Sequence, residues 1–257
     1  MNKDYEYWKK LYLAHSETNS FKKNLQKSKD IISEFLELGI KSYISWSCGK
    51  DSTAMMHLIL NLNNDIKVVS EKDDMDFPEE KEYLNEIVKL YNIDIDIISP
   101  DVNLWDIIIN HNIVEDIHSK GIDFSEKYFY DLLRGYSEKN KYKGIFLGLR
   151  AGESWGRLMN LKVHRYIYYN QNFKQVFCQP IAEWTAKDVF AYLFLNNIPI
   201  LPVYFKTNFV NSPEDIRKSW ILPGNRASEG NASWLRYYYP NIFKKLCIIH
   251  PELRSYT

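Results

Sequence analysis

Residues 43–52, Tyr-Ile-Ser-Trp-Ser-Cys-Gly-Lys-Asp-Ser, decide the fold of this chain. An alternating apolar run ends there in a loop of small residues, and residues 52–60 have helical character. Small residues let backbone N–H groups point inward, and the free N–H groups and positive dipole end of a new helix add to them. A strand, a tight loop and a helix start in direct succession therefore predict a seat for an anion such as phosphate.

The side chains of this loop suit the same ligand. Lys50 places a full positive charge at the helix start, and Ser47 and Ser52 add hydroxyls. A Walker-type loop needs a glycine five residues before Gly-Lys and a Ser or Thr directly after it. Ile44 and Asp51 occupy those two places, so that type of phosphate loop is excluded.

Length and composition limit the class of protein. At 257 residues the chain is long enough for one α/β domain with a sizeable core. Lys+Arg and Asp+Glu both number 33, so net charge argues neither for nor against nucleic acid. Three cysteines without metal-ligand spacing argue against a zinc site, an iron–sulfur site and a disulfide framework. A charged N-terminus and no apolar stretch of about 18 residues predict a cytoplasmic protein without a membrane partner.

The hydrophobic pattern predicts helices that alternate with buried strands. Beyond the first strand, we expect strands at residues 66–70, 93–98 and 144–148 and a hairpin over 163–169 and 174–179. We expect helices over residues 20–38 (closed by Gly39), 77–91, 102–136 (broken near Gly121), 185–196 (capped by Thr185 and Asp188) and about 233–249. Strands separated by helices imply crossover connections and a parallel sheet.

In an open parallel sheet, ligands bind beyond the carboxyl ends of the strands. Three loops should meet there: residues 47–52, 70–78 and 149–157. The third loop carries Arg150 and Arg157 around Glu153, and arginines can hold phosphate or sulfate with two hydrogen bonds. From residue 150 to 179, Glu153 is the single acid against five basic residues, which predicts an anionic ligand: Arg150, Arg157, Lys162, Arg165 and Lys174.

The loop at 47–52 resembles the Ser-Gly-Gly-x-Asp-Ser loop of the ATP pyrophosphatases, the PP-loop or adenine nucleotide alpha-hydrolase superfamily. Ser47 and the run from Gly49 to Ser52 match that loop, and Cys48 replaces its first glycine. In the superfamily this loop holds the pyrophosphate part of ATP while the bond between the α and β phosphates is broken. We expect the side chain of Cys48 to narrow the loop or to force its φ below zero.

Further segments are similar to the phosphoadenosine phosphosulfate (PAPS) reductase-like branch of that superfamily. Gly148-Leu149-Arg150 with Glu153-Ser154 and Arg157, Phe77-Pro78-Glu79, and the Pro-Ile-Ala-Glu-Trp-Thr-Ala-Lys-Asp-Val run at 180–189 follow its signatures. Lys72-Asp73-Asp74 stands where the branch has Asp-Thr-Gly, so substrate contacts there are expected to differ. The resemblance implies a Rossmann-like α/β fold with a parallel sheet at residues 41–205, after a helical segment at 1–40 and before an irregular helical C-terminal extension, 206–257, packed on the same domain.

The resemblance also implies a site and its cofactors, ATP and Mg²⁺. The catalytic candidates are Lys50, Asp51, Arg150 and Arg157. The nucleotide-binding candidates are Ser45, Ser47, Cys48, Gly49, Lys50, Asp51, Ser52, Ser70, Gly148, Arg150 and Glu153. Asp51 is the candidate for contacting Mg²⁺ through water or for bracing the loop, and Glu153 is the candidate for orienting an arginine.

The function implied is cleavage of ATP between its α and β phosphates to adenylylate an acceptor, which prepares that acceptor for sulfur from a partner protein. DNA phosphorothioate modification is one such context, with nucleic acid as the acceptor. The alternatives are a thioredoxin-dependent PAPS or adenylyl-sulfate reductase, sulfate or flavin adenylylation, and a subunit that senses ATP without turnover. A homodimer is left open.

Two further features bear on these alternatives. Reductases of the branch use a cysteine in a Glu-Cys-Gly-Leu-His segment, but Leu246-Cys247-Ile248-Ile249-His250 lacks the glutamate and the glycine. Cys247 falls in an apolar helical pattern, which predicts a core residue, and so does Cys178 after its strand. The aromatic and basic mixture over residues 155–169 suits nucleic acid by stacking and charge, although hairpin packing explains the same residues.

Overall fold

The structure is a computed structural model that describes residues 5–103, 105–106, 130–218, 231–249 and 251–256. The helix break expected near Gly121 lies outside these residues. No helix among the described residues is both long enough and apolar enough to cross a membrane.

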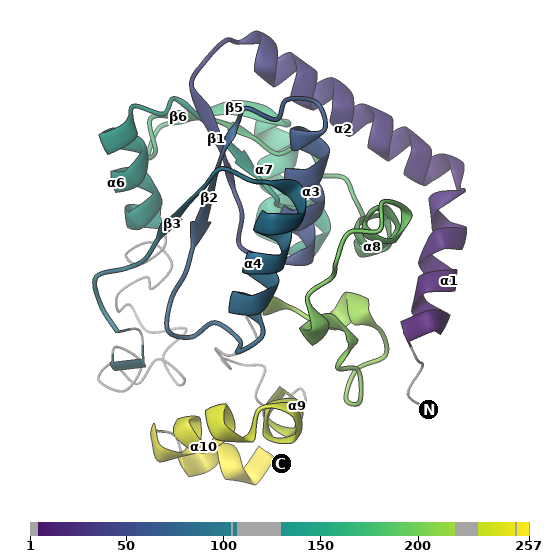
Figure 1. Cartoon of the computed structure of the whole chain (residues 1–257), viewed down its shortest axis with the longest axis vertical. Helices are drawn as coiled ribbons and strands as arrows, with labels where there is room; N and C mark the ends of the chain where they lie inside the picture. The colour runs from purple at the N-terminus through teal and green to yellow at the C-terminus, as the bar shows by residue number, and fades with distance from the viewer. Residues whose placement is uncertain (1–4, 104, 107–129, 219–230, 250, 257) are drawn as a thin grey trace.

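A six-stranded sheet with the order β3-β2-β1-β4-β6-β5 forms the centre of the molecule (Figure 1). Its strands are β1 (Ser42–Ser45), β2 (Lys67–Glu71), β3 (Ile95–Ile98), β4 (Gly144–Leu147), β5 (Ile167–Asn170) and β6 (Gln175–Cys178). All neighbours are parallel except β5 and β6, which form the expected hairpin. The α/β prediction with a mostly parallel, Rossmann-like sheet is confirmed. Because β1 lies between β2 and β4, the loop after β1 leaves the sheet at its centre.

Alternate residues of the central strands face two cores. Ile44 of β1 and Val68 of β2 lie in the larger core, with α3 (Lys50–Leu60), α4 (Glu80–Tyr91) and α8 (Ala186–Leu195). Their neighbours in the sequence, Tyr43 and Val69, face the other side of the sheet and lie in a smaller core with Leu133 of α6 (Asp131–Asn140). Strands buried on both faces are typical of a parallel sheet covered by helices.

Local sequence signals set the ends of two helices. α2 (Asn19–Glu37) begins after Thr18, whose hydroxyl accepts the Phe21 N–H at 3.3 Å, and Gly39 follows it with a φ of +62°. α8 has the expected capping box between Thr185 and Asp188. Asp188 also binds Nε2 of His15 at 2.8 Å, which ties α1 (Tyr5–Ser16) to α8.

Three expected boundaries were wrong. Residues 155–157, expected as loop, and 163–164, expected as hairpin strand, form α7 (Trp155–His164) together with residues 158–162, and Ser154 caps this helix. The helix expected over 233–249 is two helices, α9 (Asn231–Tyr238) and α10 (Pro240–Ile249), because proline has no N–H to continue a helix. The helix expected to open at Phe77-Pro78 begins at Glu80.

Several short 3₁₀ helices complete the described part of the chain. They are η2 (Ala151–Glu153), η3 (Pro202–Phe205), η4 (Pro213–Asp215) and η7 (Pro251–Tyr256). The C-terminal helices at the bottom of Figure 1 reach the larger core through Phe77, whose ring centroid lies 5.9 Å from that of Trp234 and 4.6 Å from that of Tyr239.

Gly148, which follows β4, allows the start of α3 to pack directly against the end of β4. A Cβ at this position would lie 2.7 Å from Cα and 2.9 Å from the backbone N of Ser52. Gly148→Ala is therefore expected to shift the phosphate-type loop and to lower the free energy of unfolding by about 1–3 kcal/mol, the scale of overpacking. Denaturant unfolding measures this loss.

Gly135→Ala in α6 is the matched control, since a Cβ there meets nothing within 4 Å. It should stabilise the protein by about 0.5–1 kcal/mol, as alanine does in place of glycine within a helix. Equal effects of the two changes would contradict the close approach of β4 and α3.

Candidate active site

The loop between β1 and α3 is closed by its own serines. Ser52 Oγ accepts the Ser47 N–H at 3.2 Å, lies 3.0 Å from Ser47 Oγ and donates to the Gly49 carbonyl at 3.1 Å. Gly49 is the N-cap residue of α3 and provides no side-chain cap. The N–H groups of Asp51 and Ser52 have no hydrogen-bond partner among the described residues. The helix start therefore offers two free donors to an anion.

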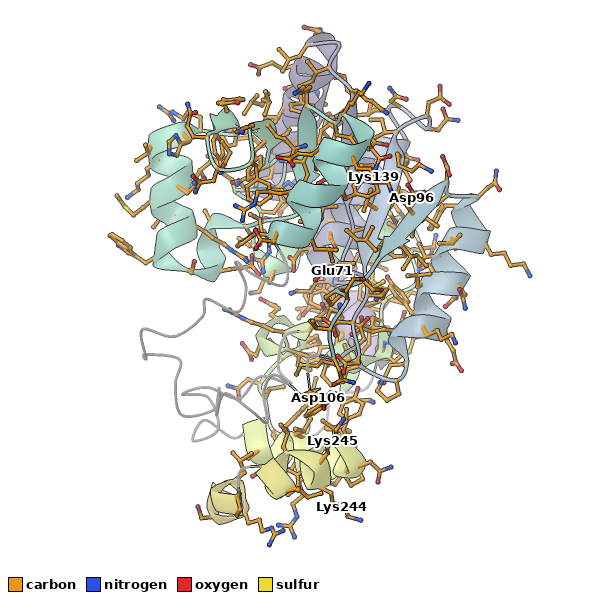
Figure 2. All side chains as sticks on the ribbon, turned by 90° about the vertical axis from the view of Figure 1, so that its left-hand side faces the viewer. Glu71, Asp96, Asp106, Lys139, Lys244 and Lys245 are labelled. Atoms are coloured by element: carbon orange, nitrogen blue, oxygen red, sulfur yellow. The ribbon has the colours of Figure 1, made fainter. Side chains whose placement is uncertain are left out.

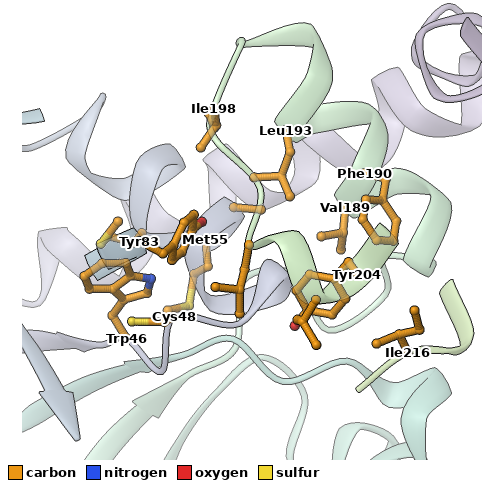
Figure 3. Close-up of a cluster of buried hydrophobic side chains, with 14 of the residues drawn as sticks. Trp46, Cys48, Met55, Tyr83, Val189, Phe190, Leu193, Ile198, Tyr204 and Ile216 are labelled. Carbon is orange, nitrogen blue, oxygen red and sulfur yellow. The ribbon is translucent and has the colours of Figure 1, made fainter. Parts of the chain in front are cut away.

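Cys48 corrects an expectation about this loop. Its φ is +59°, in the left-handed region, and not below zero. The backbone turns as a glycine would, at a cost of about 1–2 kcal/mol for a residue with a side chain. Figure 3 shows the reason: the side chain points into the larger core beside Trp46 and Met55, where it is fully buried. The loop is therefore not narrowed.

Burial raises the pKa of the Cys48 thiol, although the positive charges of Lys72 and Lys218 oppose this shift. The thiol is neutral at pH 7 and packs in the larger core, with a side-chain hydrogen bond to Lys72 at its edge. Cys48 consequently acts as a small core residue under the loop.

The carboxylate of Asp51 joins two buried cations. Its Oδ2 lies 3.0 Å from Nζ of Lys50, and its Oδ1 accepts a hydrogen bond from Nε of Arg150. Lys50 is 4% and Arg150 is 7% exposed, so water screens these pairs weakly. Burial alone would raise the pKa of Asp51, but the charges and hydrogen bonds of Lys50 and Arg150 outweigh burial and lower it. The group carries a net positive charge.

Glu153 orients both arginines of the third loop. Its Oε2 accepts the Arg150 N–H at 3.1 Å and a hydrogen bond from Arg157, and its Oε1 lies 3.7 Å from Nη2 of Arg150. Ala151 N–H donates to the Ala182 carbonyl at 2.8 Å, which fixes the loop to the segment before α8. The sequence analysis expected Glu153 to orient an arginine, and here it contacts two. The side chain of Arg157 is nevertheless 41% exposed.

Tyr204 belongs to the site, and the sequence prediction missed it. Its hydroxyl accepts the Lys50 N–H at 3.0 Å, and its ring lies 5.1 Å below Lys50 Nζ. Tyr204 comes from η3, 154 positions along the chain, and it is 1% exposed. A third donor at the start of α3 is thus occupied by a neutral hydroxyl.

A cavity of about 650 Å³ opens beside this group. Its charged lining residues are five cations and four anions: Lys50, Arg150, Lys162, Arg165, Arg217, Glu153, Glu183, Glu214 and Asp215. Of the predicted site residues, Lys50, Arg150 and Glu153 line the cavity. The others do not: Ser45, Ser47, Cys48, Gly49, Asp51, Ser52, Ser70, Gly148 and Arg157. Ser70 is fully buried, and its hydroxyl has no partner among the described residues.

The loop at 70–78 contributes a network of ion pairs. Nζ of Lys72 lies 3.1 Å from both Asp76 and Glu80, and Nζ of Lys218 lies 3.0 and 2.9 Å from the same two carboxylates. Glu80 is 1% exposed. The two lysines thus share two acids, beside the place where the branch signature has Asp-Thr-Gly.

Glu71, labelled in Figure 2, ends β2 and interacts with Lys72, Asp76 and Lys218 of this network. Burial and the nearby charges of Asp73 and Asp76 raise the pKa of its carboxyl to about 8, against the opposing effect of Lys218 and Lys72. The group is consequently mostly protonated at pH 7.

Protein ligands for a metal are few at this site. The described residues contain no group of three or more His, Cys, Asp and Glu side chains that could hold a metal ion. Both oxygens of Asp51 already bind cations. The residues therefore fit Mg²⁺ only as an ion carried by the phosphates of a ligand, which is how Mg²⁺ is often bound.

The chain matches a known protein family over most of its length. The family model for the phosphoadenosine phosphosulfate reductase domain matches residues 41–241. A PAPS reductase of Vibrio cholerae serotype O1 is 27% identical over 169 residues, which cover 63% of this chain and 62% of that protein. The chain thus spans less than two thirds of the length of the curated relatives that it matches.

Solved structures share the fold at low sequence identity. The PAPS reductase of Candida auris aligns with a TM-score of 0.53 at 12% identity, over 79% of this chain and 91% of that one. The FMN adenylyltransferase of Candida glabrata aligns with a TM-score of 0.53 at 17% identity, over 77% and 64% of the two chains. These likenesses establish the fold.

Tyr204→Phe tests whether an anion takes the place of the tyrosine hydroxyl. The free variant leaves the buried Lys50 N–H without its partner, which costs about 1–3 kcal/mol. A bound anion would replace that partner, so pyrophosphate or ATP should raise the melting temperature of Tyr204→Phe more than that of the wild type.

Tyr136→Phe is the control, because its hydroxyl donates to Oδ2 of Asp96 at 2.6 Å, on β3, and not to the loop or to α3. Its melting temperature should rise with anion as in the wild type. The same rise in all three proteins would show that the anion does not reach the Lys50 N–H.

Glu71→Gln tests the raised pKa. Between the unfolded pKa of about 4.3 and the folded value, the folded state holds a proton that the unfolded state has lost. The free energy of unfolding of the wild type should therefore fall as pH rises from about 5 to 8. Glu71→Gln should flatten this fall, and the exposed Glu37→Gln should not. Urea unfolding at a series of pH values decides, and parallel curves for all three proteins would contradict the raised pKa.

Proposed function

The chain belongs to the phosphoadenosine phosphosulfate reductase domain family, and from that premise we propose that it cleaves ATP between the α and β phosphates and adenylylates an acceptor. The observation that carries this proposal is the buried group of Lys50, Asp51 and Arg150 at the open start of α3, beside a cavity of about 650 Å³. It combines fixed positive charge with free N–H donors, as a triphosphate requires.

In the proposed reaction an acceptor oxygen attacks the α-phosphorus. The bond from that phosphorus to the oxygen bridging the α and β phosphates breaks, and pyrophosphate leaves with the electron pair. The proton of the acceptor passes to water. The N–H groups of Asp51 and Ser52 and the charge of Lys50 stabilise the negative charge that develops on the pyrophosphate. Arg150 holds the α-phosphate or the acceptor.

Mg²⁺ would enter with ATP and neutralise part of the phosphate charge. Asp51 would brace Lys50 and Arg150 and would reach the ion only through water, because both of its oxygens already bind these cations. The FMN adenylyltransferase of Candida glabrata, which shares this fold, has been solved with ATP and with FAD and pyrophosphate, and these complexes support ATP as the ligand here.

Reduction of PAPS is the second candidate, since the curated relatives are PAPS reductases. A reductase that uses its own thiol needs an accessible cysteine. All three cysteines are buried and free: Cys48 and Cys178 are 0% exposed and Cys247 is 3% exposed. Cys247 also packs in the larger core with Leu246. The burial of every thiol favours adenylylation, with sulfur supplied to the activated acceptor by a partner protein.

Products formed from α-labelled ATP and Mg²⁺ test the proposal. We expect AMP or an adenylylated acceptor together with pyrophosphate. Lys50→Ala should weaken ATP binding or turnover by roughly 2–3 kcal/mol, the scale of a lost charge-assisted contact. Lys67→Ala is the matched control, because Lys67 is paired with Asp94 and Asp96 and lies at the opposite end of β2. ADP with phosphate, or unchanged turnover in a folded Lys50→Ala protein, would contradict the assignment.

Cys247→Ser separates the two candidates in the same assays. It should leave ATP cleavage nearly unchanged and lower stability, because a hydroxyl replaces a thiol in an apolar site. Thioredoxin-dependent release of sulfite by the wild type, abolished in this variant, would establish the reductase in place of our proposal.

A further inference from the structure

Residues 154–182 contain no aspartate or glutamate, although the whole chain has 33 acidic and 33 basic residues. Glu153 and Glu183, which flank this segment, each have hydrogen-bond or ion-pair partners. Glu153 binds Arg150 and Arg157, and Glu183 pairs with Lys27 at 2.6 Å and accepts the Tyr166 hydroxyl at 2.6 Å. Glu153 thus neutralises Arg157 within the segment, whereas Lys162, Arg165 and Lys174 form an ion pair with neither flanking glutamate.

Four residues of this segment form one stripe along α7. Trp155, Leu158 and Lys162 are separated by three and four positions, which places them on the same face of α7, and Arg165 is the residue directly after the helix. Trp155 is 76% exposed and Leu158 is 38% exposed. Leu158, Lys162 and Arg165 line the cavity that also contains Lys50 and Arg150. The stripe thus runs from the surface into the proposed active site.

The two cations of the stripe are available to a ligand. Neither Lys162 nor Arg165 makes an ion pair with any described residue. Arg165 follows α7 with φ +64° and ψ −150°, a region that glycine adopts readily and other residues only under strain. Its charge is held at the cavity at a conformational cost, which is typical of binding sites.

The acids across the cavity do not neutralise these cations. Glu214 accepts the Tyr12 hydroxyl at 3.3 Å, and Asp215 accepts the Ser212 N–H at 3.1 Å within η4. An exposed indole beside unpaired cations, with a cavity at one end, matches the stacking surfaces and electropositive grooves that bind single strands. Protein interfaces are by contrast depleted in lysine at their centres.

We infer that a single-stranded nucleic acid binds along α7, with a base stacked on Trp155 and backbone phosphates on Lys162 and Arg165. The helix has 10 residues and is therefore about 15 Å long, enough for a few nucleotides. The inference rests on the proposed function in one respect: the strand is the acceptor, and the cavity brings one of its oxygens to the α-phosphate.

Fluorescence anisotropy of a short labelled DNA strand and of its RNA counterpart, titrated without ATP at several salt concentrations, tests the binding surface. We expect the joint change Lys162→Glu and Arg165→Glu to weaken binding at least about tenfold and to reduce the salt slope by about 1.4, since a single-strand phosphate contact contributes about 0.7. Trp155→Ala should weaken binding about tenfold, within the range for one stacked base.

Lys174→Glu is the control, with one charge reversal of the same kind in the same acid-free segment but at the β5–β6 turn. It should bind like the wild type. Equal weakening by Lys174→Glu, unchanged binding by the α7 variants, or binding to anionic lipid vesicles and not to either strand would each overturn the inference. If the double charge reversal does not fold, glutamine at both positions replaces it.

The acceptor role has a separate readout. Added strand should raise AMP or pyrophosphate formation from labelled ATP by the wild type and not by Trp155→Ala. Strand binding without any ATP cleavage would reject the proposed function and retain the surface. ATP cleavage without strand binding would retain the proposed function and reject the nucleic-acid surface on α7.

Discussion

The carboxylate of Asp51 holds the candidate site together, because it joins two parts of the chain that lie 99 positions apart. Asp51 is in the first turn of α3, and Arg150 is in the loop after β4. The same two segments touch at Gly148, where the absence of a side chain lets β4 meet Ser52. Close backbone contact brings Asp51 and Arg150 within reach, and their ion pair fixes the charge at the cavity. An Asp51 without its partners would be a buried, uncompensated charge, which is strongly destabilising.

The loop in this structure is satisfied largely by the protein's own groups. Ser52 fills the centre of the loop, and the Tyr204 hydroxyl accepts the Lys50 N–H. These internal hydrogen bonds pair the buried N–H groups of Ser47 and Lys50, whereas those of Asp51 and Ser52 have no partner among the described residues. They also mean that ligand binding exchanges one set of hydrogen bonds for another, so affinity depends on the stronger, charge-assisted bonds that a phosphate forms.

The sequence predicted the sheet, the loop at 47–52 and the grouping of Lys50 with Arg150 and Glu153, because these depend on local patterns and on the rule that ligands bind at the carboxyl ends of parallel strands. It did not predict Tyr204, whose contact with Lys50 spans 154 positions and has no local signature. The prediction of a negative φ for Cys48 was wrong. Burial of its side chain in the core, and not the local sequence, decides the backbone conformation there. α7 was missed because Leu161 is its one buried residue, which leaves little periodicity to detect.

Two groups of cations flank the candidate site, and the structure uses them differently. Lys72 and Lys218 share Asp76 and Glu80, so the loop at 70–78 is committed to its own network. Lys162 and Arg165 on the α7 side line the cavity and are not in any ion pair among the described residues. An anionic ligand gains more binding free energy from unpaired cations than from paired ones. Breaking a buried ion pair would leave its acid as an uncompensated charge. Recognition of the acceptor should consequently depend on α7 more than on the loop at 70–78, where Lys72-Asp73-Asp74 stands in place of Asp-Thr-Gly.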